Sequence, residues 1–219
     1  MLDAHGRLAH GGFVVEDGTV VEVGPHAAHD ERIDLGERVL LPGAVDPHVH
    51  FRDPGHPEKE DFRSGTRAAA LGGVTTVMDM PNTDPPVFSR DVLERKQRIA
   101  EERALVDFGL YAGLDAEGRA TSMFSHATAV KIYLGATTGN LLVRQRTVLR
   151  HALEAAARAG RTVAVHCESQ DCIERHAHLA HDDDFQSHAR SRPPACEAEA
   201  IRDLATAAVK STNVVVETP

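Results

Sequence analysis

Strand-like apolar segments alternate with helical patterns along most of this chain, and this alternation constrains its fold more than any other feature. The predicted strands cover residues 44–51, 74–81, 106–114, 127–135 and 162–169. The predicted helices cover residues 61–73, 89–103, 146–160 and 195–209. This order predicts an α/β fold with a parallel sheet covered by helices. Strands that begin about every 30 residues also have the spacing of a TIM-like (β/α)8 barrel.

Residues 1–43 differ from the rest of the chain and are predicted to form a small N-terminal β unit. Two β-branched runs flank the sequence EDGT, in which Asp-Gly is a strong signal for a hairpin turn. Residues 44–219 are then left for the barrel, and eight strand–helix units take about 250 residues. The barrel is therefore predicted to be incomplete.

A sixth predicted strand, with the sequence NVVVETP, begins at Asn213. Its distance from the strand that begins at Thr162 is long for one strand–helix unit and short for two. This spacing predicts that residues are missing near positions 204–210. The incomplete barrel also predicts further chain after Pro219.

The composition excludes several classes of partner. The 219 residues include 24 basic and 33 acidic side chains, which give a net charge of −9, and the basic residues do not cluster. Nucleic acid and anionic membranes are therefore not expected partners. Apolar runs stay well below the roughly 18 residues of a membrane span, and the N-terminal residues lack the apolar region of a signal peptide. A cytoplasmic location is predicted.

The three cysteines, Cys167, Cys172 and Cys196, have no zinc-finger spacing. Their odd number argues against a disulfide framework, so none is predicted. Cys167 is predicted to pack on the strand face opposite to that of its neighbour His166.

The segment DPHVHFRDPG places four polar side chains on one face of a predicted strand: Asp46, His48, His50 and Arg52. Burying such groups without partners costs on the order of a few kcal/mol each, so water, a metal ion or a ligand must contact them. Chance alone gives about one such histidine pair among 14 histidines, which makes the pair weak on its own. Its setting adds weight, because an apolar run precedes it and a turn follows, which places it at the carboxyl end of a buried strand.

Other polar residues end the neighbouring predicted strands, where a barrel builds its site. Asn82 follows the second strand, Lys131 lies within the fourth and His166 ends the fifth. Apolar neighbours leave Lys131 alone on the interior face, where an ammonium group is disfavoured; the alternative is a solvated lysine on an edge strand. A buried lysine can lose its proton and react with CO₂, which yields a carbamate able to bridge two metal ions.

Three imidazoles and one bridging carbamate form a ligand set that suits Zn²⁺. Two such ions about 3.5–4 Å apart can activate water and polarise a carbonyl group, which favours hydrolysis of a stable bond. The guanidinium of Arg52 suits a substrate carboxylate, and Asn82 can add a donor. The alternative for Arg52 is a surface ion pair with Asp53 or Glu58.

Five segments resemble those of the cyclic amidohydrolases, and of the dihydroorotases among them, in that family's order: LPGAVDPHVHFRDPG, DMPNT, VKIYLGATTGNLLV, VAVHCES and RSRPPACEAEAI. The resemblance covers residues 12–201. It implies a binuclear zinc barrel, with a β-sandwich formed partly by the N-terminal strands. It implies hydrolysis of dihydroorotate to N-carbamoyl-aspartate in pyrimidine biosynthesis.

The resemblance also implies roles for individual residues. His48 and His50 would hold the more buried ion, His166 would hold the more exposed ion, and carbamylated Lys131 would bridge them. Arg52 and Asn82 would bind the substrate carboxylate, and the arginine favours dihydroorotate over the rings of allantoinases and hydantoinases. Homodimers occur among such enzymes.

The sequence departs from the dihydroorotase pattern in two ligands. A dihydroorotase is expected to have a further histidine on strand six and an aspartate on strand eight, the latter serving as ligand and proton shuttle. No histidine follows His188, and the catalytic aspartate is not visible in the chain. One alternative is therefore a non-catalytic relative that serves as an assembly partner of aspartate transcarbamoylase, and another is an allantoinase-type or hydantoinase-type hydrolase.

Overall fold

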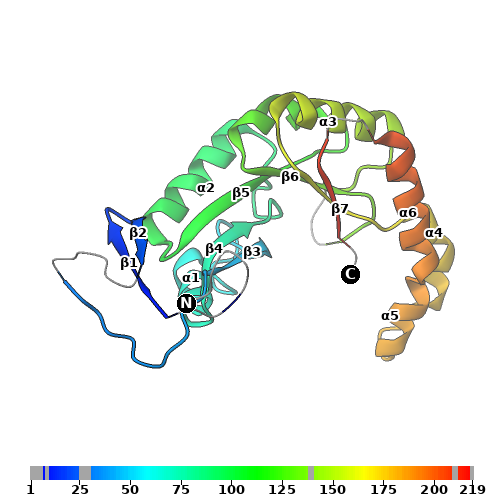
Figure 1. The fold of residues 1–219 in the computed structure, drawn as a ribbon. Coiled ribbons are helices and arrows are strands. Elements are labelled where there is room, and N and C mark those ends of the chain that lie inside the picture. The colour runs from blue at the N-terminus through cyan, green and yellow to red at the C-terminus, as the bar shows by residue number, and fades with distance from the viewer. Residues whose placement is uncertain (1–6, 8–9, 25–30, 138–140, 209–211, 218–219) are drawn as a thin grey trace. The chain divides into compact units, whose positions relative to one another are not determined.

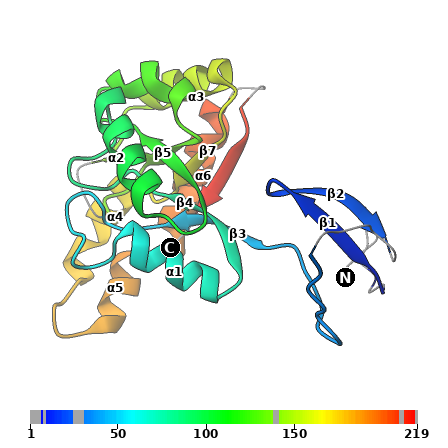
Figure 2. The same ribbon diagram turned by 90° about the vertical axis from the view of Figure 1, so that its left-hand side faces the viewer.

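The computed structural model describes residues 7, 10–24, 31–137, 141–208 and 212–217. The chain divides into two compact units, Met1–Gly43 and Ala44–Pro219. The described part of the first unit contains an antiparallel hairpin, shown in Figure 2, formed by β1 (Gly12–Glu16) and β2 (Thr19–Gly24). Asp17 and Gly18 form its turn with φ of 48° and 77°, the left-handed region that Asp-Gly adopts in tight hairpins. The hairpin predicted at this dipeptide is present.

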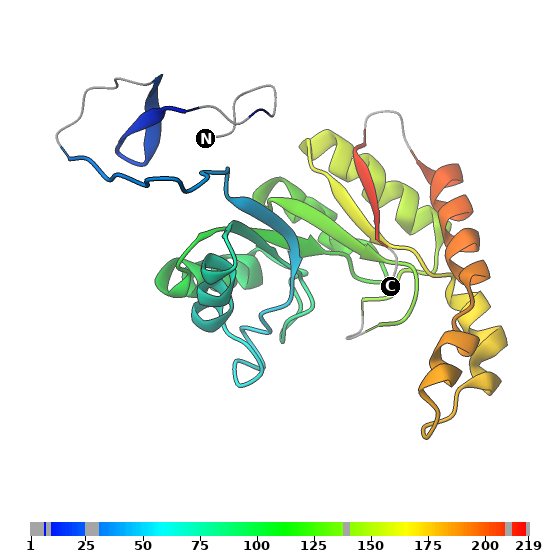
Figure 3. The same cartoon turned by 60° about the horizontal axis from the view of Figure 1, so that its bottom comes forward.

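The second unit contains a six-stranded parallel sheet in which neighbours in space are also neighbours in sequence. This order is that of a barrel wall, and Figures 1 and 3 show that the sheet curls. All six predicted strands are present. Their bounds are β3 (Ala44–Val49), β4 (Val74–Asp79), β5 (Asp107–Gly113), β6 (Ala129–Tyr133), β7 (Val163–His166) and β8 (Val214–Glu217).

Helices connect the strands, and α2 and α3 lie along the outer side of the curved sheet (Figure 1). Side-chain caps start two of the predicted helices: Asp61 accepts a hydrogen bond from the Ser64 N–H, and Ser89 accepts one from the Val92 N–H. None of the described helices combines the length and apolar composition of a transmembrane segment. Their bounds are α1 (Phe62–Leu71), α2 (Arg90–Arg103), η1 (Arg119–His126), α3 (Arg146–Ala159), α4 (Gln170–His176), η2 (Ala177–Leu179), α5 (Phe185–Ser191) and α6 (Pro194–Ala207).

The two faces of the sheet have different surroundings because side chains alternate along a strand. Val130 and Ile132 of β6 belong to the main core cluster, together with Leu149 and Leu153 of α3. The residues between and beside them face the interior of the curl. A smaller apolar cluster lies on that inner face and consists of Met80, Tyr111, Ala129 and Ala164.

Strand β3 differs from the buried strand that the sequence predicts. It is an edge strand of the described sheet, and Val45 is 60% exposed. The strand ends at Val49, so His50 and Arg52 lie beyond it, and Arg52 has a φ of 60°. The prediction of a buried strand was wrong because only one neighbouring strand covers β3 among the residues that the structure describes.

The expectation of missing residues near positions 204–210 stays a prediction, although helices account for the spacing that prompted it. Strands β7 and β8 pair directly in parallel, with His166 opposite Glu217. The chain between them forms α4, η2, α5 and α6, so the extra length is helical and no strand is skipped. Residues 209–211 lie outside the described part of the chain.

A disulfide joins Cys172 of α4 to Cys196 of α6, which corrects the expectation of none. An odd number of cysteines does not prevent one pair from bonding when the fold brings two Cα atoms within reach, and these Cα atoms are 5.1 Å apart. Cys167 is free, fully buried and part of the main core, which confirms its predicted packing role. Burial raises the pKa of its thiol to about 11.

Replacing Cys172 and Cys196 together by alanine is expected to lower the free energy of unfolding by about 3 kcal/mol. The disulfide closes a segment with a sequence separation of 24, and its loss frees that segment in the unfolded chain. Denaturant unfolding with and without dithiothreitol measures the effect. The reductant should destabilise the unmodified chain and leave the stability of the double variant unchanged. Identical unfolding curves of the unmodified chain with and without dithiothreitol would contradict the assignment of the disulfide.

Candidate metal centre

Six residues singled out from the sequence line one pocket of about 500 Å³ at the carboxyl ends of the strands: His48, His50, Arg52, Asn82, Lys131 and His166. Asp46 does not line it, and its Oδ1 accepts the His48 N–H at 3.0 Å. This volume falls in the range of small-molecule sites, roughly 300–1,000 Å³. Four further residues complete the lining, namely Tyr133, Thr137, Val216 and Glu217.

Alternation along the strands brings these side chains to the pocket. On β6, Lys131 and Tyr133 share the inner face with Ala129. Lys131 is opposite Ala164 in the ladder with β7, and His166 is opposite Glu217 in the ladder with β8. Consecutive strands therefore place one polar group after another along the same inner face.

The imidazoles of His48 and His50 face each other, with their Nε2 atoms 3.2 Å apart. Their other ring nitrogens are already engaged by oxygen acceptors: His48 Nδ1 lies 3.1 Å from Glu217 Oε1, and His50 Nδ1 lies 2.7 Å from Asn82 Oδ1. A neutral imidazole has one protonated nitrogen, so both protons belong on Nδ1 and both Nε2 lone pairs point at the same space.

This arrangement fits a zinc ion. Zn–N bonds of about 2.0–2.1 Å at a tetrahedral angle separate two ligand nitrogens by roughly 3.3–3.4 Å, close to the observed separation. Two facing lone pairs repel each other unless a cation lies between them. Burial lowers the pKa of both His48 and His50, and the charge of Lys131 lowers that of His48 further, so both rings are held in the neutral form that binds metals.

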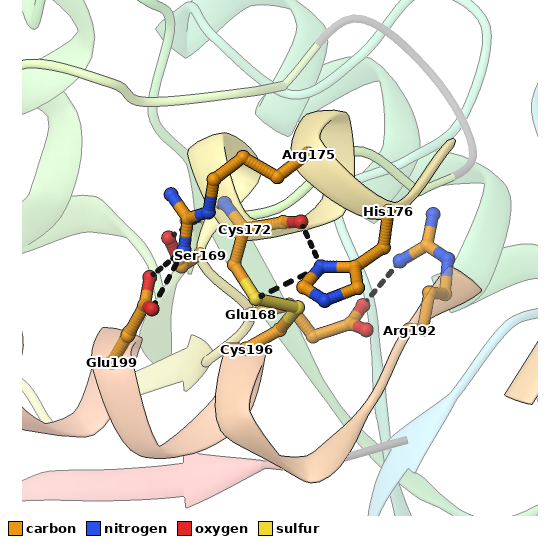
Figure 4. Close-up of a disulfide and its surroundings, with 8 residues drawn as sticks. All are labelled: Glu168, Ser169, Cys172, Arg175, His176, Arg192, Cys196 and Glu199. Carbon is orange, nitrogen blue, oxygen red and sulfur yellow. Dashed lines mark hydrogen bonds and ion pairs between the residues drawn. A yellow bond between two sulfur atoms is a disulfide. The ribbon is translucent and has the colours of Figure 1, made fainter. Parts of the chain in front are cut away.

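His166 is held by a different carboxylate. Its Nε2 lies 2.9 Å from Oε2 of Glu168, which is only 2% exposed, so its Nδ1 remains available as a ligand. Arg192 donates to the same carboxylate and, through Nη2, to the Ala136 carbonyl at 2.8 Å. Figure 4 shows the Glu168–Arg192 contact beside the disulfide. Burial alone would raise the pKa of Glu168, but the hydrogen bond from His166 and the charge of Arg192 outweigh it and lower that pKa.

Lys131 is buried, as the interior-face prediction requires, with 1% of its surface exposed. Its ammonium group contacts Glu217 Oε2 and lies 5.1 Å from the centroid of the Tyr133 ring. Burial lowers the pKa of Lys131 to about 8, which favours the neutral amine that carbamate formation needs. The carboxylate of Glu217 acts in the opposite direction, because a nearby negative charge favours the ammonium form.

Arg52 lines the pocket and does not form the alternative surface ion pair in the described part of the chain. Its Nη1 donates to the Asn82 carbonyl at 3.4 Å, while Asp53 pairs with Arg103 at 2.9 Å. The side-chain carbonyl oxygen of Asn82 accepts the hydrogen bond from His50, so the amide hydrogens of Asn82 remain available as donors.

Sequence reasoning missed four polar residues of this site, namely Tyr133, Thr137, Glu168 and Glu217. Glu168 had a local signal, since an acidic residue two positions after a strand-end histidine can share its face. Glu217 had none, because its partners lie on other strands. The hydroxyl of Tyr133 is buried without a described hydrogen-bond partner, and burial raises its pKa, so it stays protonated as a donor.

The sequence profile of the amidohydrolase family matches residues 39–217. The chain belongs to the amidohydrolase family. It is 38% identical over 196 residues to a dihydroorotase from Methanothermobacter thermautotrophicus, a match that covers 87% of this chain and 44% of the relative. A dihydroorotase from Halobacterium salinarum is 37% identical over 164 residues, covering 74% and 38%. An allantoinase from Rubrobacter xylanophilus is 36% identical over 197 residues, covering 85% and 43%.

Solved structures of amidohydrolases have the same fold. An L-hydantoinase (dihydropyrimidinase) from Arthrobacter aurescens superposes with a TM-score of 0.84 at 26% identity, and the match covers 94% of this chain and 48% of that one. The chain spans less than half the length of the curated relatives it matches. The predicted incomplete barrel and the predicted resemblance to dihydroorotases are both confirmed.

A buried ion pair holds the backbone directly after the histidine pair of this amidohydrolase. Lys96 of α2 lies 2.6 Å from Asp79 Oδ2 and donates to the Met80 carbonyl at 2.7 Å. Asp79 Oδ1 in turn accepts the Phe51 N–H at 2.9 Å, directly after His50. Lys96 and Asp79 are both fully buried, so the pair fixes the backbone beside the site from helix α2.

Replacing Lys96 by methionine is expected to lower the free energy of unfolding by about 3–5 kcal/mol. The change leaves the carboxylate of Asp79 buried without its counter-ion, which costs more than the pair itself contributes. Lys59→Met, at an exposed position, is the matched control and should change stability by less than about 0.5 kcal/mol. Denaturant unfolding measures both, and similar values for the two variants would contradict the role given to the pair.

Proposed function

We propose that this protein is a zinc-dependent cyclic amidohydrolase that reversibly hydrolyses dihydroorotate to N-carbamoyl-L-aspartate in pyrimidine biosynthesis. The observation that carries the proposal is the pair of Nε2 atoms 3.2 Å apart, each on a ring whose Nδ1 is already bonded to an oxygen. The dihydroorotase relatives support the choice of substrate.

The residues of the pocket divide between two metal positions. His48 and His50 would hold one zinc ion, His166 would hold the second, and carbamylated Lys131 would bridge them. A bound zinc pair supplies Lewis acidity toward a ring carbonyl and lowers the pKa of water. Growth with ¹³C-bicarbonate followed by ¹³C NMR tests whether Lys131 carries a carbamate.

The remaining pocket residues bind and orient the substrate. The guanidinium of Arg52 forms charge-assisted hydrogen bonds to a carboxylate, and the amide hydrogens of Asn82 add a donor. A ring that carries a carboxylate, such as dihydroorotate, satisfies Arg52; an uncharged hydantoin ring does not.

Metal analysis of the purified full-length protein is expected to find two zinc ions per chain. Chelation should remove both the metal and the activity, and added zinc should restore them. His50→Ala is expected to lower the zinc content, because it removes one of the two facing nitrogens, while His151→Ala on α3 serves as the exposed control. A chain that binds no zinc would contradict the proposal and favour a non-catalytic assembly partner of aspartate transcarbamoylase.

Arg52→Met is expected to reduce kcat/KM for dihydroorotate about 10–100-fold, since a hydrogen bond to a charged group contributes about 1.5–3 kcal/mol. Turnover of hydantoin or allantoin, where present, should change little, and Arg63→Met on the exposed surface is the control. Steady-state kinetics with the three substrates measure the effect. Unchanged dihydroorotate turnover would defeat the assignment of Arg52 as the carboxylate-binding residue.

An allantoinase-type or hydantoinase-type activity is the second candidate, because an allantoinase and an L-hydantoinase are among the similar proteins. The same three-substrate assay separates these activities. The proposal further includes a homodimer, a complex with aspartate transcarbamoylase and a cytoplasmic location. Light scattering of the protein alone and with aspartate transcarbamoylase tests the first two.

A further inference from the structure

We propose that Glu217 is a positioning residue of the metal centre, whose carboxylate holds His48 so that its Nε2 faces the ion beside His50. This inference rests on the proposed metal centre and adds to it a residue from the last described strand.

Glu217 contacts two other strands from the carboxyl end of β8. Its Oε1 lies 3.1 Å from Nδ1 of His48 on β3, and its Oε2 contacts Nζ of Lys131 on β6. The side chain of Glu217 is 16% exposed, so water competes only weakly for these contacts. One carboxylate thereby links the first and the last strand of the described sheet through a metal ligand.

The carboxylate decides which nitrogen of His48 carries the proton. An ionised carboxylate only accepts hydrogen bonds, so its contact with Nδ1 places the proton there and leaves a lone pair on Nε2. Without this acceptor, a proton on Nε2 could be donated to His50 Nε2 at 3.2 Å. The two rings would then bond to each other at the place where both must offer a lone pair to a cation.

The other two imidazoles are held in the same way. Asn82 accepts from Nδ1 of His50 at 2.7 Å, and Glu168 accepts from Nε2 of His166 at 2.9 Å. Glu217 completes a set in which each imidazole of the pocket has an oxygen acceptor on one nitrogen and a free lone pair on the other. Loss of such an acceptor typically weakens metal binding about 10–100-fold.

The test compares Glu217→Ala, Glu217→Gln and Glu102→Ala, an exposed control on α2, with the unmodified chain. Glutamine keeps a carbonyl oxygen that can accept the His48 proton, whereas alanine removes the acceptor. Zinc affinity is measured by competition with a chromophoric chelator. The tautomer of His48 is read from ¹⁵N NMR of the metal-free protein, with the signal assigned from a His48→Gln variant.

The expected result is a zinc affinity about 10–100-fold lower for Glu217→Ala, and within about threefold of the unmodified chain for Glu217→Gln and the control. The metal-free unmodified chain and Glu217→Gln should show His48 protonated on Nδ1, and Glu217→Ala should show a mixture. Wild-type affinity in Glu217→Ala would overturn the proposal. Equal losses in the alanine and glutamine variants would also overturn it, because they would make Glu217 a direct ligand.

These outcomes are separate from those that test the proposed function. If His50→Ala loses zinc while Glu217→Ala does not, the metal centre stands and the role of Glu217 fails. If no cyclic amide is hydrolysed but the tautomer and affinity follow the expected order, the role of Glu217 stands and the hydrolase assignment fails. Should Glu217→Ala not fold, Glu217→Leu, which also removes the acceptor but keeps more of the side-chain volume, takes its place, and unchanged zinc affinity in that variant would refute the acceptor role.

Discussion

The strict alternation of side chains along parallel strands is the constraint on which this structure depends. On β6, Val130 and Ile132 enter the apolar layer beneath the helices, and the intervening Lys131 is forced to the inner face. The same rule turns His166 inward while Val163 and Val165 pack outward. A shift of one residue in either strand would bury the polar groups among aliphatic side chains and empty the pocket of its ligands.

The hydrogen bonds that orient His48 and His50 in the pocket join residues that are distant in sequence. His50 and Asn82 are 32 residues apart, and the oxygen that holds His48 comes from the opposite end of the described sheet. Oxygen acceptors from other segments orient the lone pairs of His48 and His50, whereas Glu168, two residues away, orients His166. Helix α2 stabilises the backbone next to the site from the outer side of the sheet, because its Lys96 neutralises the buried Asp79 that accepts the Phe51 N–H. The site is therefore a property of the sheet as a whole.

Much of the architecture could be predicted from the sequence, because strand alternation, helix caps and the Asp-Gly hairpin are local signals. The six pocket residues could be found because each lies at or near a strand end, where a barrel gathers its chemistry. Between β7 and β8 only α6 was predicted; α4 and α5, the disulfide and the contact of Glu217 with His48 could not be found in this way. Each depends on how segments pack in space, and neither residue spacing nor cysteine parity encodes that packing.

The edge strand β3 has backbone groups that are free to pair with a further strand. The backbone on its outer side is not paired with any other strand among the described residues, and Val45 beside it is exposed. Such an edge is a template onto which a strand from another chain can hydrogen-bond. A strand that pairs there, from this chain or from another, would lie beside the strand that carries His48.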